Sequence, residues 1–346
     1  MSKRILKALL VLWLSSQWLG VASAFDITTN RTPGAPVPVQ VNGLYGYIND
    51  RGEIIIQPQF KYAADFYEGL ASVLLGNQGG FIDTSGKLVI PAQFEVNPSR
   101  FSEGLAAVQV KGKTGYITKG GQMVIPAQFD NAREFREGVA RVEMGPPNDR
   151  KTGYINTKGE IVAPATLNLG WDFSEGLAAV WKGAKVGFID KTGKLVIPAQ
   201  FKGAGQFSEG LAKVQVGNKW GYIDKSGTVV IKPQFNYANE FSEGLAAVKI
   251  GKKFGYIGKD GKLVIKTGYD WGNPFSEGLA AVRIGTDQGK WKYGYIDKTG
   301  KIVVPVQFNE TDKFSAGLAW VYLGPPGQGK SGYIDKTGCY VWQPTR

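Results

Sequence analysis

The stretch that decides the fold runs from residue 187 to residue 214 and reads GFIDKTGKLVIPAQFKGAGQFSEGLAKV. A glycine, an aromatic residue and an isoleucine lead into a short polar turn that ends in Gly193. Because glycine readily adopts the positive φ that such loops need, the turn predicts a β-hairpin between two apolar runs. Pro198 should stop or bend the second strand, since proline cannot donate to a β-ladder. The apolar residues after Gly210 predict a third strand.

The same unit returns along the whole chain. The Gly-aromatic-Ile anchor recurs at spacings of 34 to 39 residues, and its glycines are Gly46, Gly80, Gly115, Gly153, Gly187, Gly221, Gly255, Gly294 and Gly332. No stretch has a convincing helical period. Since one small unit cannot bury its own apolar face, neighbouring units must stack. We predict an all-β domain over residues 37–346, a tandem array of about nine three-stranded antiparallel meanders.

The two ends of the repeat indicate how the array is arranged. Residues 37–41 can form a strand before the first anchor, and the chain ends soon after residues 340–342, in a second hairpin strand. The array therefore begins and ends at the same phase. A closed propeller often completes one blade with strands from both termini, and that offset is not visible. We therefore expect an open β-solenoid or superhelical array, with a closed β-propeller-like ring as the alternative.

The N-terminus predicts export. Residues 1–24 combine three basic residues, the apolar run of residues 8–14 and the small-residue site Ala22-Ser23-Ala24, as in a secretory signal peptide. We expect cleavage after Ala24, a flexible leader over residues 25–36 and a secreted or periplasmic chain. No later window is long and apolar enough to predict a transmembrane helix.

Composition limits the chemistry and the partners. The chain has 41 basic and 29 acidic residues, a net charge of +12, and removing the signal segment leaves +9. This favours anionic partners, while the absence of a helical basic region or zinc-finger spacing makes nucleic acid an unlikely one. The single cysteine, Cys339, cannot form an internal disulfide, and we expect it to be buried. Without histidine, a Ser-His-Asp triad and histidine metal sites are excluded.

Carboxylates remain the only candidates for catalysis. One glutamate recurs before Gly-Leu or Gly-Val, and the eighth unit has Ala316 in its place. The copies are Glu68, Glu103, Glu137, Glu175, Glu209, Glu243 and Glu277. Catalytic carboxylates need environments that separate their pKa values, and equivalent copies do not provide them. We expect these glutamates to accept bonds from turn N–H groups or to pair with repeat lysines, with a repeated calcium site as the minor alternative, and we predict no cofactor and no metal.

The pattern resembles the WG-repeat family, named for a Trp-Gly pair at the anchor. Its closest local match is Lys219-Trp220-Gly221-Tyr222-Ile223-Asp224, and the GYID, KLVIPxQF and FSEGLAAV motifs recur from about residue 38 to residue 342. The aromatic before the glycine becomes Tyr45, Phe254 or Tyr293 in other units, and five anchors lack it. The resemblance implies an interaction scaffold without a family-wide active site.

Function should lie where the repeat fails. Three insertions share one slot between the third strand and the next anchor, at residues 144–152, 285–293 and 323–331. In a stacked array they should project from one side, where repeat proteins carry binding loops. Tryptophans also replace consensus residues in units four and seven. The predicted binding rim comprises Arg150, Lys151, Lys290, Trp291, Lys292, Lys330, Trp171 and Trp271.

These observations predict an exported, non-enzymatic repeat scaffold that binds a protein or an anionic or carbohydrate ligand of the envelope or of a host surface. One alternative is a carboxylate-dependent glycoside hydrolase that uses non-repeat acids such as Asp172 and Asp270. The other alternative is a purely structural component of the envelope.

Overall fold

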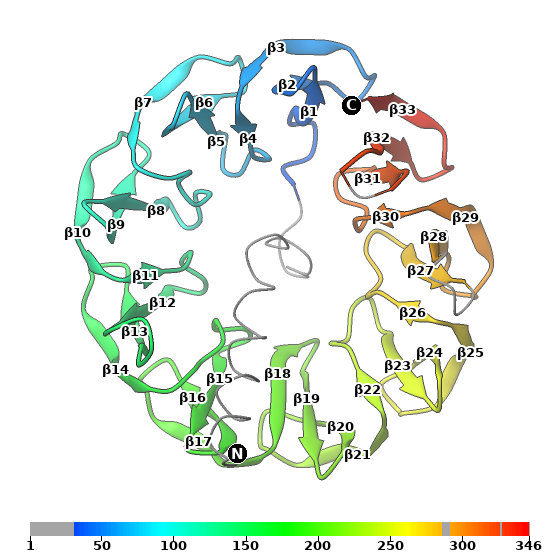
Figure 1. Ribbon diagram of the computed structural model, residues 1–346. Helices are drawn as coiled ribbons and strands as arrows, with labels where there is room; N and C mark the ends of the chain where they lie inside the picture. Colours follow the sequence, from blue (N-terminus) through cyan, green and yellow to red (C-terminus); the bar gives the residue numbers. More distant parts are fainter. Residues whose placement is uncertain (1–30, 286–290, 326, 346) are drawn as a thin grey trace, which may run out of the picture. The chain divides into compact units, whose positions relative to one another are not determined.

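The computed structural model describes residues 31–285, 291–325 and 327–345. These residues form nine small antiparallel sheets, which follow one another around a closed ring (Figure 1). The protein is therefore a nine-bladed β-propeller, and we number the blades 1 to 9 in chain order. The predicted signal segment lies outside the described residues. No helix that could cross a membrane is present in the described part of the chain.

Each blade contains up to four strands, which we call A to D from the inside of the ring outwards (Figure 1). The A strands are β4 (Tyr62–Ala63), β11 (Asn131–Ala132), β18 (Gly203–Ser208), β22 (Tyr237–Ala238), β26 (Trp271–Gly272) and β30 (Glu310–Thr311). The B strands are β1 (Val37–Val41), β5 (Leu70–Leu75), β8 (Leu105–Val110), β12 (Val139–Met144), β15 (Leu177–Lys182), β19 (Leu211–Val216), β23 (Ala246–Ile250), β27 (Ala280–Ile284) and β31 (Leu318–Leu323). Blades 1, 3 and 5 have no A strand among the described residues.

The anchor motifs form the C strands, and the KLVIP motifs form the D strands at the outside. The C strands are β2 (Leu44–Ile48), β6 (Gln78–Asp83), β9 (Lys113–Thr118), β13 (Lys151–Asn156), β16 (Lys185–Asp190), β20 (Lys219–Ile223), β24 (Lys253–Ile257), β28 (Lys292–Ile296) and β32 (Lys330–Asp335). The D strands are β3 (Ile54–Phe60), β7 (Leu88–Phe94), β10 (Met123–Phe129), β14 (Ile161–Leu167), β17 (Leu195–Phe201), β21 (Val229–Phe235), β25 (Leu263–Tyr269), β29 (Ile302–Phe308) and β33 (Tyr340–Thr345).

The expectation of an open array is wrong, and the alternative of a closed ring is confirmed. Blade 9 packs directly on blade 1, so the first and last strands of the ring lie close together (Figure 1). The Tyr333 hydroxyl donates to the Pro38 carbonyl at 3.0 Å, and the Arg31 N–H donates to the Ser315 hydroxyl at 2.6 Å. Side-chain packing and these bonds close the ring without a strand shared between the two ends. The matching phase of the termini is therefore no argument against closure.

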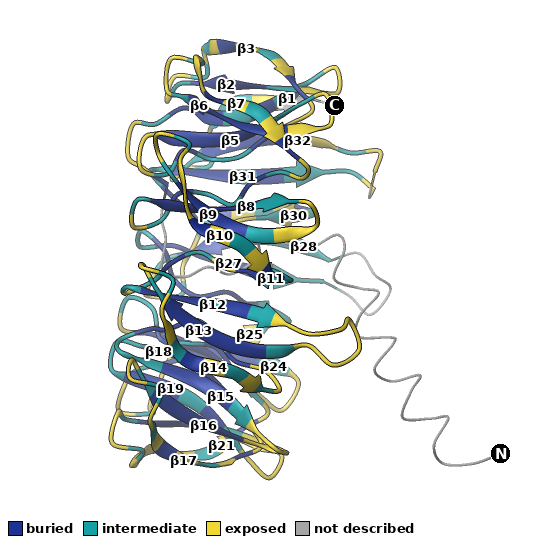
Figure 2. Ribbon diagram, turned by 90° about the vertical axis from the view of Figure 1, so that its left-hand side faces the viewer, coloured by how far each residue is buried: buried dark blue, intermediate teal, exposed yellow. Residues whose placement is uncertain are grey.

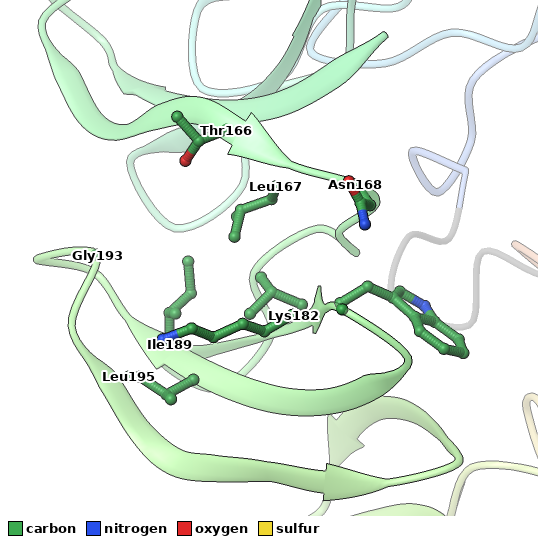
Figure 3. Close-up of a pocket in the computed structure, with 10 residues that line it drawn as sticks. Thr166, Leu167, Asn168, Lys182, Ile189, Gly193 and Leu195 are labelled. Carbon is green, nitrogen blue, oxygen red and sulfur yellow. The ribbon is translucent and has the colours of Figure 1, made fainter. Parts of the chain in front are cut away.

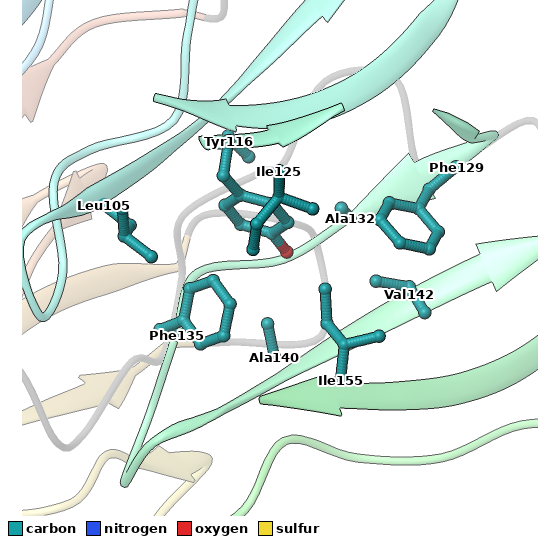
Figure 4. Packing of buried hydrophobic residues seen from close by; sticks show 10 residues of the cluster. Leu105, Tyr116, Ile125, Phe129, Ala132, Phe135, Ala140, Val142 and Ile155 are labelled. Carbon is teal, nitrogen blue, oxygen red and sulfur yellow. The ribbon is translucent and has the colours of Figure 1, made fainter. Parts of the chain in front are cut away.

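The core lies between the blades. A typical layer joins Tyr116 and Phe129 of blade 3 to Phe135 and Ile155 of blade 4, all of them buried (Figure 4). The consensus Tyr and Phe of the anchor are buried throughout the ring, as at Tyr47, Phe188 and Tyr295. Because each blade buries its apolar faces only against its neighbours, the repeat requires stacking, as expected for such units.

The anchor glycine is explained by the strand beside it. Strands C and D are out of register at this point, where residues 198–200 of strand D lie opposite the single residue Gly187. A Cβ on Gly187 would lie 2.6 Å from the Ile197 carbonyl oxygen and 2.7 Å from the Ala199 nitrogen. No side chain fits between these backbones, so the position requires glycine. Pro198 lies in the same bulge, consistent with its predicted effect on pairing.

Two further predictions concern the chain termini. Residues 25–30 of the predicted leader lie outside the described residues, whereas residues 31–36 run alongside the ring, with Arg31 and Pro36 buried. The expectation that Cys339 is buried is wrong, since it is exposed. It follows the C–D turn of blade 9, at the position that Lys194 occupies in blade 5. That position faces solvent in both blades.

Candidate binding face and seam pocket

The ring has two faces, because successive strands of each blade run in opposite directions. The A–B turns and the C–D turns lie on one face, which we call the clasp face. The B–C turns and the connections from strand D to the next blade lie on the other, which we call the connector face. The exposed loop between β12 and β13, one of the predicted insertions, projects from the connector face (Figure 2).

On the clasp face, the repeated glutamate reaches the next blade. Glu209 accepts a hydrogen bond from the Gly244 N–H at 3.1 Å, and its carboxylate lies 3.2 Å from the Lys259 ammonium. The equivalent glycine contacts are Glu68–Gly104, Glu103–Gly138, Glu137–Gly176, Glu175–Gly210, Glu243–Gly278 and Glu277–Gly317. The equivalent lysine contacts are Glu68–Lys119, Glu137–Lys191, Glu175–Lys225, Glu243–Lys298 and Glu277–Lys336. The structural role predicted for this glutamate is confirmed, and we call the contact the glutamate clasp.

The clasp glutamate occupies a strained backbone position. Glu209 and Gly210 have φ values of 54° and 85°, as in a type I′ turn. Asn or Gly is preferred there, since a larger L-residue at positive φ costs about 1–2 kcal/mol. The contacts of the Glu209 carboxylate with Gly244 and Lys259 of the next blade offset this cost. Burial alone would raise the pKa of Glu137, but hydrogen bonds from the Gly176 N–H and Lys191 lower it overall.

Both components of the clasp are missing at blade 1. At the junction of blades 9 and 1, Ala316 replaces the glutamate and Asp50 replaces the lysine. At the junction of blades 1 and 2, the corresponding residues are Gly34 and Thr84. The loss of the glutamate on one side is thus matched by the loss of the lysine on the other. We call the junction of blades 9 and 1 the seam.

On the connector face, lysines form a regular arc. The first residue of strand C is lysine in every blade from 3 to 9. The seven lysines are Lys113, Lys151, Lys185, Lys219, Lys253, Lys292 and Lys330. Since equivalent positions of stacked blades follow one another around the ring, these ammonium groups lie along one rim of the connector face. We call them the lysine arc.

The partners of the arc leave much of its charge uncompensated. The Lys219 ammonium lies 3.2 Å from the amide oxygen of Asn236, and that of Lys292 lies 2.7 Å from the amide oxygen of Asn309. These neutral amides orient the lysines without neutralising them. Lys113 and Lys253 instead meet Asp130 and Asp270 at 2.6 Å. On the clasp face the equivalent repeat lysines all contact glutamates, so the connector face is the more basic one.

The predicted rim is only partly gathered on this face. Lys151, Lys292 and Lys330 belong to the lysine arc, and Arg150 is exposed in the insertion before Lys151. Trp291 is half-buried, with its ring 4.6 Å from the Arg283 guanidinium. Lys290 lies outside the described residues. The arc as a whole was missed, although aligning the units shows lysine two residues before the anchor glycine in seven of them.

The two tryptophans of the predicted rim differ in their environment. Trp171 is 41% exposed and lies in the segment that replaces strand A in blade 5. Trp271 is half-buried between blades, with its ring 5.0 Å from Phe254 and 5.5 Å from Tyr237. Its indole N–H donates to the Asn273 side chain at 2.6 Å. Trp271 is mainly a packing residue, whereas Trp171 is accessible.

One cavity lies where the repeat fails in blades 4 and 5. It has a volume of about 390 Å³ and opens between Leu167 of blade 4 and Ile189 and Leu195 of blade 5 (Figure 3). Leu167 stands where most D strands end in phenylalanine, and blade 5 has no A strand to fill the space. Blade 3 also lacks strand A, but there Pro98 packs against Gly79.

A second cavity of about 230 Å³ lies in the seam, and we call it the seam pocket. Blade 1 has no described A strand, and Ser331 stands where four other blades have an aromatic residue before the anchor glycine. Trp320 and Tyr322 form one wall, with stacked rings 6.0 Å apart and an interplanar angle of 22°. The other lining residues are Pro38, Val39, Gln40, Tyr45, Ser331, Gly332, Tyr333 and Trp342. Trp320 departs from the repeat consensus, but the sequence does not indicate a pocket beside it.

The acids considered for hydrolysis are not brought together. Asp172 belongs to blade 5 and lies 3.3 Å from the Arg141 guanidinium. Asp270 lies before blade 8, where burial would raise its pKa but Lys253 and the Gly285 N–H lower it. Within the described ranges, no cluster of three or more acidic or cysteine side chains could hold a metal ion. Asp172 and Asp270 therefore do not form a catalytic carboxylate pair.

The sequence profile of the "WG containing repeat" matches residues 45–78, 80–113, 115–145, 153–185, 187–220, 220–254, 254–291 and 293–324. No functionally curated protein matches the chain. Among solved structures, the dihydro-heme d1 dehydrogenase NirN shares 13% identity with a TM-score of 0.47, over 95% of this chain and 76% of that one. Hsv2p of Kluyveromyces lactis shares 11% identity with a TM-score of 0.44, over 72% of this chain and 97% of that one. TolB from Acinetobacter baumannii shares 12% identity with a TM-score of 0.34, over 70% of this chain and 76% of that one. These likenesses are too distant for function to be transferred.

Proposed function

We propose that this chain, which belongs to the WG-repeat family, is an exported, non-enzymatic scaffold that binds an extended acidic polysaccharide across its connector face. The lysine arc is the observation that carries the proposal. It repeats one ammonium group per blade, and amide partners hold several of these groups without neutralising them. A polymer with regularly spaced carboxylates or sulfates matches such an array.

The arrangement favours a polysaccharide over a folded protein. Protein interfaces usually depend on a central apolar or aromatic cluster that becomes fully desolvated. The arc offers separated lysines at the ends of strands, such as Lys185 and Lys219, which are exposed. Attraction between such groups and a polyanion is long-ranged and weakens as salt screens it. Binding should therefore be strong at low ionic strength and fall steeply with salt.

Charge reversal of the arc tests the proposal. The triple variant Lys185→Glu, Lys219→Glu and Lys292→Glu should weaken binding to polygalacturonate at least tenfold, measured by co-sedimentation at low salt. The matched control, Lys87→Glu, Lys194→Glu and Lys301→Glu, changes the net charge equally on exposed turns of the clasp face. This control should retain most of the binding. Equal losses in both variants, or none in the first, would contradict the proposal.

The other two parts of the proposal have their own tests. Polygalacturonate should keep its chain length after prolonged incubation with the protein, measured by size-exclusion chromatography. Shortening of the polymer would instead indicate hydrolysis. Sequencing of the exported protein should give Phe25 as its first residue, as expected if cleavage follows Ala24.

A further inference from the structure

We propose that the seam pocket holds one pyranose ring of the bound glycan. This inference rests on the proposed function and adds a sugar-specific subsite to the charge-driven arc. The pocket has a volume of about 230 Å³, which suits a single ring and is small for an extended ligand. A pyranose can stack its C–H face on an aromatic wall while its hydroxyl groups meet polar atoms at the edge.

The aromatic wall is unusual within this ring. At the junction of blades 6 and 7, Trp220 and Tyr237 lie 6.5 Å apart and fill the equivalent space with each other. The Tyr237 position belongs to strand A, which blade 1 lacks in the described residues. Trp320 and Tyr322 of blade 9 therefore line an open space and stack in parallel. Large aromatic side chains left partly exposed in a pocket mark a binding site more often than a packing defect.

The insertion in blade 9 holds this wall in place. The Tyr322 hydroxyl donates to the Pro325 carbonyl at 2.8 Å and accepts the Gly329 N–H at 2.7 Å. A Cβ on Gly329 would collide with the Tyr322 ring, so the glycine permits the close approach. The ring is thus oriented before a ligand arrives, which reduces the entropy lost on binding. This gives the third predicted insertion a definite role.

The propeller fold does not require a tryptophan at position 320. The equivalent position in strand B is alanine in four other blades, at Ala107, Ala179, Ala247 and Ala281. A propeller blade therefore forms without an aromatic side chain at this point. Trp320 is only half-buried, so part of its apolar surface remains exposed to solvent. A ligand that covers the ring would use that surface.

A sugar fits the pocket better than an added peptide strand. A peptide that extended blade 1 would need backbone donors and acceptors along the free edge of β1. Pro38 has no N–H, and its carbonyl already accepts the Tyr333 hydroxyl. This edge is therefore a poor template for strand addition. The polar atoms at the mouth of the pocket, including the Ser331 hydroxyl, suit the hydroxyl groups of a sugar.

The seam pocket also adjoins the lysine arc. Ser331 in the pocket directly follows Lys330, the last lysine of the arc. Side chains alternate along a strand, so the two point to opposite sides of β32. One glycan chain can therefore place a ring in the pocket while its charged groups follow the arc. The pocket would supply selectivity for the sugar, and the arc would supply charge-dependent affinity.

Tryptophan fluorescence of the full chain tests the proposal with neutral methyl pyranosides of glucose, galactose, mannose and N-acetylglucosamine. At least one should give a saturable change in the millimolar range, which Trp320→Ala abolishes while the chain still melts cooperatively. The matched control Trp181→Ala removes a half-buried tryptophan of blade 5 that does not line the seam pocket, and it should leave the change intact. Saturation by none of these sugars, or loss in the control instead, would overturn the proposal.

The two proposals can fail separately. The arc variant should lose polygalacturonate binding but keep the methyl pyranoside response, since its substitutions lie outside the seam pocket. Trp320→Ala should keep salt-dependent polymer binding and lose about tenfold in discrimination between polymers of equal charge and different sugar. If a short aromatic peptide saturated the signal and the sugars did not, the pocket would be a peptide site and the sugar proposal would be wrong.

Discussion

The junction of blades 6 and 7 and the seam solve the same packing problem by different means. At the former, the Tyr222 hydroxyl bonds to the Asn239 carbonyl at 2.7 Å, and Glu209 forms a full clasp. At the seam, Tyr333 bonds to Pro38 in strand B, because no described A strand is available. The buried core of the first junction has nine apolar residues, and that of the seam has five.

This difference shows which contacts the ring requires and which it can replace. The tyrosine bond and a layer of apolar packing occur at both junctions. The clasp and the A strand are absent at the seam, and Arg31 partly compensates for them. Its guanidinium lies over the Tyr333 ring at 5.3 Å and 3.4 Å from Asp65 of blade 2. Closure therefore needs packing, while the seam shows that a junction can form without the clasp.

The largest expected difference between the two junctions concerns their tyrosines. Tyr222→Ala should lower the free energy of unfolding by about 4 kcal/mol, because it empties a tight core and leaves a buried carbonyl without its partner. Tyr333→Ala should cost about half as much, since its layer is smaller and adjoins a pocket. Urea unfolding followed by circular dichroism gives both values. Equal losses would show that the seam is packed as tightly as the other junctions.

The glutamate clasp should contribute less than the core. Glu243 contacts the Gly278 N–H at 3.1 Å and Lys298 at 3.0 Å, so Glu243→Ala should cost about 1–2 kcal/mol. Glu103 bonds to the Gly138 N–H, and Thr157 stands where the paired lysine would be. Glu103→Ala should therefore cost less than Glu243→Ala in the same unfolding experiment. Equal losses in the two variants would assign the clasp energy to the glycine bond alone, and a larger loss in Glu103→Ala would contradict the prediction.

The strands, their order and the role of the glutamate could all be predicted, because each leaves a local mark in the sequence. Gly193 marks a hairpin, Pro198 marks a bulge, and seven copies of one glutamate indicate a shared structural task. Closure leaves no such mark. Closure requires Tyr333 to contact Pro38, which is far away in the sequence. Whether they come into contact depends on the rotation between successive blades, summed over the whole ring.

Of the two functional features, the lysine arc could be predicted from the sequence and the seam pocket could not. The lysine arc is visible once the units are aligned, because Lys219 and its equivalents share one position. The seam pocket is not visible, since it arises from a strand that is missing and from Ser331 in place of an aromatic residue. Trp320 was recognisable as an exception, but its meaning depends on the neighbour that blade 1 fails to provide. A residue that departs from the repeat consensus can indicate where a site lies, but it does not show the shape of the site.

Acid should weaken the junction of blades 4 and 5, where Glu137 forms the clasp. The pKa of Glu137 lies below its ordinary value of 4.5, because the Gly176 N–H and Lys191 outweigh the effect of burial. A carboxyl with a lowered folded-state pKa contributes stability above its unfolded-state pKa and loses it as the pH falls through the folded-state value. Thermal unfolding should therefore lose this contribution below about pH 4.5, and Glu137→Gln should flatten that part of the profile. If Glu137→Gln had the same pH profile of thermal unfolding as the original protein, Glu137 would not contribute to the acid response.

The smallest expected effect comes from building a clasp into the seam. Ala316→Glu alone places a carboxylate towards Asp50, so it should not stabilise the ring. Combined with Asp50→Lys, it restores both charged residues of the clasp and should add about 0.3–1 kcal/mol, as expected for a partly exposed ion pair. A double-mutant cycle gives the interaction energy between the two new residues, apart from the effect that each substitution has alone. If the cycle gave no coupling, the turn between β2 and β3 would be too different in shape to present a lysine to blade 9. The clasp would then depend on the turn geometry of blades 3 to 9 as much as on its charges.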